Sequence, residues 1–79
     1  MLVKIRFSEG LLDFTVEEKS KLIGLKLEKE SDDGNIKYRL TTDNITQVFT
    51  SITSLGYRNK LILSSDKEGK FCIMELSKQ

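Results

Sequence analysis

The side chains best suited to covalent chemistry are scarce in this sequence. It has no histidine and a single cysteine, Cys72. A nucleophilic thiol needs a neighbouring base or cation and partial exposure, whereas Phe71 and Ile73 flank this one, so we predict a buried and unreactive thiol. No Ser-His-Asp or Cys-His pair, histidine-containing zinc site or internal disulfide can be built from this chain.

The acidic residues are numerous, but most fall where turns and strand ends are expected. General acid–base catalysis needs carboxylates that converge in a cleft. Asp32 and Asp33 could hold Ca²⁺ or Mg²⁺, yet Asp-Asp-Gly-Asn is also ordinary hairpin-turn chemistry and no EF-hand spacing follows it. The glycines stand singly, so there is no phosphate-binding loop. We therefore expect no enzymatic activity, no catalytic residues, no cofactor and no metal.

Length and composition set further bounds. The chain has 79 residues, a formal net charge of +1 and 32% charged residues, which predicts one globular domain over residues 1–79. Lys4, Arg6 and Glu9 interrupt the apolar residues of the N-terminus, so a signal peptide is not expected, and no apolar run is long enough for a membrane helix. With one cysteine in an apolar run, the prediction is a cytoplasmic protein.

The clearest element is a helix over residues 43–56. Its apolar residues recur at spacings of three and four and form one stripe, which consists of Ile45, Val48, Phe49, Ile52 and Leu55. Asp43 or Asn44 can cap its start, and Gly56 stands where a left-handed C-terminal cap is expected. Phe49 is expected in the core, so Phe49→Ala should cost about 3–5 kcal/mol.

Most of the remaining residues alternate between apolar and polar types, which predicts three hairpins. The first joins residues 3–7 to 12–16 through Ser8-Glu9-Gly10. The second joins 23–27 to 36–40 through 32–35, and the third joins 58–64 to 70–76. Together they predict an α+β fold in which an antiparallel sheet carries one helix on one face, in the order β-β-β-β-α-β-β.

The segment after residue 14 allows a second interpretation. Thr15-Val16-Glu17-Glu18 fits a capping box, and Gly24 could end a short helix from Val16 to Ile23. The order would then be ferredoxin-like, β-α-β-β-α-β plus an extra strand. The strand interpretation is preferred because such a helix would bury at most Val16, Leu22 and Ile23.

Strand alternation also sorts the charges by face. If the apolar residues point toward the helix, the opposite face receives acidic Asp13 and Glu28 together with the cations Lys4, Arg6, Lys26, Lys37, Arg39, Arg58 and Lys60. A basic sheet attracts phosphates. Long cationic side chains are also common on outward strand positions, where they cover apolar sheet and deter edge pairing. Among aromatic residues only Tyr57 is expected near this face, so base stacking is not supplied.

The outward side of the predicted helix is uncharged. Short hydroxyl side chains lose little entropy when covered and shed no charge, which suits docking against a partner. The last strand, residues 71–76, is apolar on both faces, as expected for a central strand or one covered by another subunit. The central position is the preferred interpretation.

These patterns favour a small non-enzymatic protein that binds another protein or a second copy of itself as a homodimer. The predicted contact residues are Thr46, Gln47, Thr50, Ser51, Ser54 and Met74. The alternative is a nucleic-acid-binding protein that uses the cations named above as backbone contacts. Neither a membrane nor a small-molecule substrate is inferred as a partner.

Overall fold

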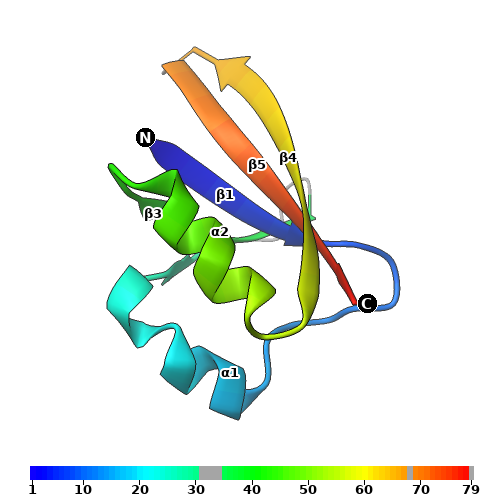
Figure 1. Cartoon of the computed structure of the whole chain (residues 1–79). Helices are drawn as coiled ribbons and strands as arrows, with labels where there is room; N and C mark the ends of the chain where they lie inside the picture. The colour runs from blue at the N-terminus through cyan, green and yellow to red at the C-terminus, as the bar shows by residue number, and fades with distance from the viewer. Residues whose placement is uncertain (31–34, 68, 79) are drawn as a thin grey trace.

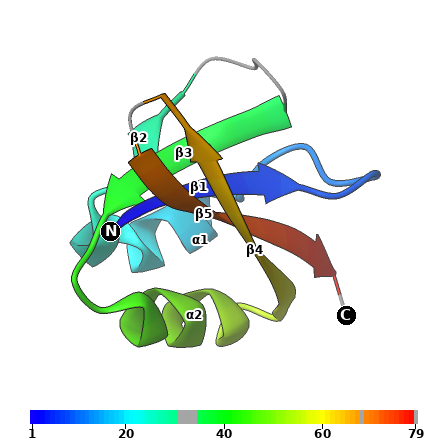
Figure 2. The ribbon, with the colours of Figure 1, turned by 90° about the horizontal axis from the view of Figure 1, so that it is seen from above.

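The computed structural model describes residues 1–30, 35–67 and 69–78. In chain order its elements are β1 (Leu2–Phe7), α1 (Val16–Lys21), a 3₁₀ turn η1 (Ile23–Leu25), β2 (Glu28–Lys29), β3 (Ile36–Thr41), α2 (Ile45–Thr53), β4 (Tyr57–Asp66) and β5 (Gly69–Lys78). The strands form one five-stranded sheet, and α1 and α2 lie on the same side of it (Figures 1 and 2). The chain therefore has the predicted α+β fold.

The sheet is mixed, with the strand order β2-β3-β1-β5-β4. All neighbours are antiparallel except β1 and β5, which are parallel, so the prediction of an antiparallel sheet holds only in part. The parallel pair arises because β4 takes the sheet edge and the hairpin returns β5 between β4 and β1 (Figure 1). This interior position of β5 confirms the preferred interpretation of its two apolar faces.

The hairpin predicted between residues 3–7 and 12–16 is wrong. The second half forms no strand, and α1 begins at Val16, as in the alternative interpretation. Thr15 Oγ1 accepts a hydrogen bond from the Glu18 N–H (3.1 Å), and the Glu18 carboxylate accepts one from the Thr15 N–H (2.9 Å). This reciprocal capping box satisfies donors that an isolated helix start leaves unpaired, and it outweighs the short alternating pattern.

The second hairpin forms with a shorter first strand than predicted. Residues 23–25 make η1, Lys26 is left-handed with φ 55°, and β2 contains Glu28–Lys29 alone. The predicted turn around Asp32 and Asp33, and the metal site considered there, lie outside the described residues. The third hairpin is confirmed and is longer than predicted, with paired residues from Tyr57 and Lys78 to Asp66 and Gly69.

Helix α2 confirms the helix predicted over residues 43–56, with narrower bounds. The Asn44 side chain accepts a hydrogen bond from the Gln47 N–H (3.2 Å), and Gly56 takes the positive φ of 94° that ends the helical segment. Val48 and Ile52 are fully buried, but Phe49 is 39% exposed. The expectation that Phe49 belongs to the core is therefore wrong, because it lies on one flank of the apolar stripe.

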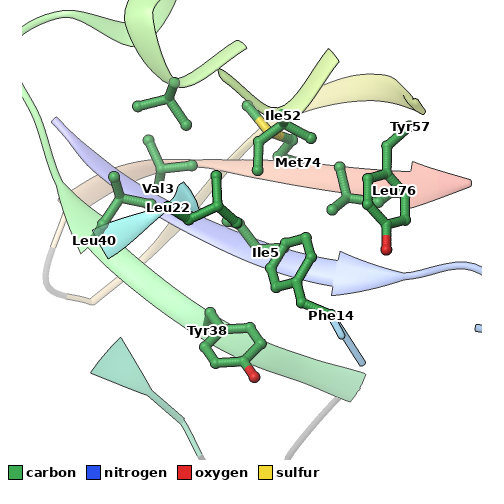
Figure 3. Packing of buried hydrophobic residues seen from close by; sticks show 11 residues of the cluster. Val3, Ile5, Phe14, Leu22, Tyr38, Leu40, Ile52, Tyr57, Met74 and Leu76 are labelled. Atoms are coloured by element: carbon green, nitrogen blue, oxygen red, sulfur yellow. The ribbon is translucent and has the colours of Figure 1, made fainter. Parts of the chain in front are cut away.

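The core fills the space between the sheet and the helices (Figure 3). Phe14 and Leu22, which flank α1, are buried in it, whereas Val16 and Ile23 are exposed, so α1 does not bury the face that the sequence suggested. The Phe14 ring meets Tyr57 edge-on at 5.6 Å between centroids. The buried cluster comprises Val3, Ile5, Phe14, Leu22, Tyr38, Leu40, Val48, Ile52, Tyr57, Met74 and Leu76.

Candidate interaction surfaces

Asp13 fastens the segment before α1 to the sheet. Its Oδ1 accepts hydrogen bonds from the Tyr38 hydroxyl and the Phe14 N–H, and its Oδ2 lies 3.2 Å from Lys19 Nζ. Burial raises the pKa of Asp13, but the donors from Tyr38, Phe14 and Lys19 outweigh it and hold the pKa below its usual value. Asp13 therefore lies on the helix side, and its predicted place among the basic strand residues is wrong.

Glu18 makes a second, similar attachment. Its carboxylate accepts a hydrogen bond from the Tyr57 hydroxyl (2.7 Å) and lies 3.5 Å from Lys78 Nζ. Burial raises the pKa of Glu18, and the bonds from Thr15, Tyr57 and Lys78 more than reverse this, so the pKa is lowered overall. Burial and the bond to Glu18 raise the pKa of Tyr57. Because α1 buries no residue of its own, these carboxylates serve to hold it in place.

Cys72 is buried, as predicted, and burial raises the pKa of its thiol. A thiol whose pKa is raised stays protonated, and a protonated thiol is a poor nucleophile. Within residues 1–30, 35–67 and 69–78, no three histidine, cysteine or acidic side chains gather to hold a metal ion. No helix in the same ranges is long and apolar enough to cross a membrane.

The face of the sheet that points away from both helices, called the open sheet face below, collects most of the predicted cations. Residues on it alternate along the strands with the buried residues of the core. Lys26 lies outside the strands, directly after η1, and borders a shallow hollow together with Arg39 and Glu28. The cations on the open sheet face are Lys4, Arg6, Lys37, Arg39, Arg58 and Lys60.

More carboxylates lie among these cations than the two predicted from the sequence. Arg6 pairs with Glu75 at 2.9 Å, Arg39 with Glu28 at 3.3 Å, and Lys4 lies 3.8 Å from Glu30. Glu75 was missed because its position beside Arg6 follows from the parallel pairing of β5 with β1, which is not a local signal. Arg58 and Lys60 of β4 have no ion pair with any described residue.

An apolar strip crosses the same face. Phe71 and Ile73 on β5 alternate with buried Cys72 and Met74, and Ile73 lies opposite Ile62 of β4. The Phe71 ring lies under Lys4 Nζ at 4.5 Å. Tyr57, by contrast, is buried on the helix side. The aromatic residue of the open sheet face is therefore Phe71, and the expectation that Tyr57 would be the exposed one is wrong.

A second apolar surface lies where α2 meets β4, and we call it the α2–β4 margin. Asn59 of β4 donates a hydrogen bond from Nδ2 to Thr53 Oγ1 of α2 (2.7 Å). Phe49 is one helical turn before Thr53 and therefore lies on the same side of α2 as Thr53. Leu61 is two residues after Asn59 and therefore lies on the same face of β4 as Asn59. Leu63 continues this row on β4. Phe49, Leu61 and Leu63 are 39%, 46% and 70% exposed.

The predicted contact residues of α2 adjoin this margin. Thr46, Gln47, Thr50 and Ser54 are exposed and Ser51 is half-buried. No charged residue occurs from Asn44 to Tyr57. Met74, grouped with them from the sequence, is fully buried beneath α2 and belongs to the core rather than to a contact surface.

Sequence reasoning grouped the helix residues but missed Phe49, Leu61 and Leu63. The exposure of the two leucines could have been predicted, because the strand that contains them is long and a helix of α2's length cannot cover all of it. No protein-family model, curated protein or solved structure matches this chain. The surfaces described above are therefore the basis for inferring its function.

Proposed function

We propose that this chain is a small binding protein that acts by protein–protein association through the α2–β4 margin and the uncharged face of α2. The observation that carries the proposal is the row of exposed apolar side chains, Phe49, Leu61 and Leu63, beside a helix face without charge. Clustered apolar exposure rimmed by polar residues is typical of protein contact surfaces.

The neighbouring sheet edge supports the same proposal. β4 is the last strand in the sheet order, so its outer edge pairs with no other described strand. All ten of its residues keep a regular register with β5, and no bulge twists the edge away. An edge of this kind offers backbone donors and acceptors next to the apolar row.

The test adds a charge to the helix face without touching the core. In Thr50→Lys the new ammonium lies on the uncharged face of α2, adjacent to Phe49, and association should weaken because the charge must be desolvated. Ser20→Lys, on exposed α1, is the matched control and should leave association unchanged. The measurements are the mass in light scattering and cross-linked capture from a lysate of the cells of origin. Unaltered mass together with intact capture in Thr50→Lys would contradict the proposal.

A second candidate function is nucleic-acid binding on the open sheet face. The observation that favours it is Phe71, a partly exposed ring under Lys4 Nζ on the same sheet face as Arg58 and Lys60. Binding should appear in an anisotropy titration with single-stranded RNA or DNA and weaken linearly in log salt. Lys60→Glu should abolish it, whereas Lys29→Glu on the other sheet edge should not. Absence of binding at low salt would remove this candidate.

A further inference from the structure

We propose that the partner is a second copy of this chain, joined edge to edge through antiparallel β4 strands about a twofold axis at Ile62. This inference rests on the proposed function, because it names the occupant of the α2–β4 margin.

The order of residues in β4 is complementary to itself in one register. With Ile62 opposite its own copy, Leu61 faces Leu63 of the other chain, and Leu63 faces Leu61. Opposed residues of an antiparallel pair share a face of the sheet, and both leucines lie on the helix side because they pair with Met74 and Cys72 in β5. The exposed leucines of the two copies would therefore cover one another.

The charges of β4 agree with this register. Arg58 comes opposite Asp66 of the second copy, and both lie on the open sheet face. A carboxylate has acceptor sites for more than one donor, so Asp66 can accept from Arg58 as well as from a contact in its own chain. Neighbouring registers lose these matches: an axis at Leu61 puts Arg58 opposite Ser64, and an axis at Leu63 puts Leu61 opposite Ser65.

The same arrangement covers the uncharged side of α2. An axis perpendicular to the sheet keeps the helices of both copies on one side of a continuous sheet. Phe49 and Thr53 mark the side of α2 that points toward β4, so the two α2 helices face each other across the axis with Phe49 and Thr46 between them. One contact would thus pair the open edge of β4, cover its exposed leucines and explain why the exposed side of α2 carries no charge.

A cysteine at the axis tests the register directly. In Ile62→Cys the two new thiols are directly opposed, with Cα atoms about 4.5–5.5 Å apart, which is within the range of a disulfide. Mild oxidation should then link most of the protein into a covalent dimer. Ser64→Cys is the matched control on the same strand and face, where the two thiols would be separated by about 13 Å and should not link. Buried Cys72 remains in every variant, and the wild type should stay unlinked.

The mass in solution tests the partner itself. The wild type should form dimers of twice its 9.0 kDa mass, and Leu63→Lys should raise the dimer dissociation constant at least about tenfold, since two leucine contacts are lost per dimer. Leu63 is mostly exposed within one chain, so the fold should persist, as far-UV circular dichroism would check. Linking through residue 64 instead of 62 would overturn the proposed register.

The outcomes separate this inference from the proposed function. A wild type that stays monomeric at high concentration overturns the second copy as partner. If Thr50→Lys still impairs capture of another protein in that case, the proposed function stands with a different partner. If capture is unaffected as well, both are overturned.

Discussion

Replacing Glu18 with glutamine should reveal how α1 is held to the sheet. The Glu18 side chain is only 13% exposed and accepts bonds from the Thr15 N–H and the Tyr57 hydroxyl, with Lys78 at 3.5 Å. A hydrogen bond to a charged group contributes about 1.5–3 kcal/mol. Glutamine keeps one acceptor oxygen but loses the charge, so Glu18→Gln should lower the free energy of unfolding at neutral pH by about 1–2 kcal/mol.

The stabilisation by Glu18 should depend on pH, and the direction follows from the pKa of its carboxyl group. The pKa of Glu18 is lower in the folded protein than its ordinary value of 4.5. Its contribution to stability is therefore complete above that value, declines as the pH falls below it, and is lost once the pH has passed through the folded pKa. The difference between wild type and Glu18→Gln should shrink toward zero over this acid range. Asp13, whose pKa is also lowered, leaves some acid sensitivity in both proteins.

Urea unfolding followed by circular dichroism at a series of pH values measures these differences. All samples need one protein concentration, because association would contribute to apparent stability. The control is Glu17→Gln, the adjacent residue of α1, whose side chain is 80% exposed and lies 3.6 Å from Lys21. It should change stability by less than about 0.5 kcal/mol at every pH. Equal effects of the two substitutions would refute the role assigned to Glu18.

Two further predictions concern the core. Ile52→Ala should lower the free energy of unfolding by about 2–5 kcal/mol because Ile52 is fully buried, whereas Phe49→Ala should lower it by about 1–2 kcal/mol because that ring is 39% exposed. Urea unfolding in the Leu63→Lys background measures both costs. Equal costs would contradict the described packing. The Cys72 thiol should react with Ellman's reagent in urea but very slowly in the native protein, because it is buried and its pKa is raised. Rapid labelling of the native protein would count against its burial.

Local patterns were sufficient to predict α2 and the hairpin of β4 and β5. The apolar spacing and the Asn44 cap are properties of contiguous residues, and the structure keeps both. The segment at 12–16 was mispredicted because Phe14 and the Thr15 capping box favour different structures over the same few residues. The core accepts the Phe14 ring from a loop, so the capping box could form without loss of burial.

The surfaces depended on pairings that sequence patterns do not encode. Glu75 and Phe71 reach the open sheet face because β5 lies between β1 and β4, and this order is set by packing of the whole sheet. Phe49 fits the helical stripe as well as Val48 does, but it lies on the flank of that stripe and stays 39% exposed, whereas Val48 is fully buried. The basic strand positions were predicted correctly for β1, β3 and β4, and so was Glu28 beside Arg39, whereas Glu75 and Glu30, the partners of Arg6 and Lys4, were not.

The most direct test of self-association through the α2–β4 margin is sedimentation equilibrium of the wild-type chain beside Leu63→Lys over a wide concentration range. We expect the wild-type mass to rise from 9.0 kDa toward twice that value with concentration, while Leu63→Lys remains near the monomer mass over the same range. A wild-type mass that stays at 9.0 kDa throughout, or a Leu63→Lys curve that coincides with the wild type, would contradict it.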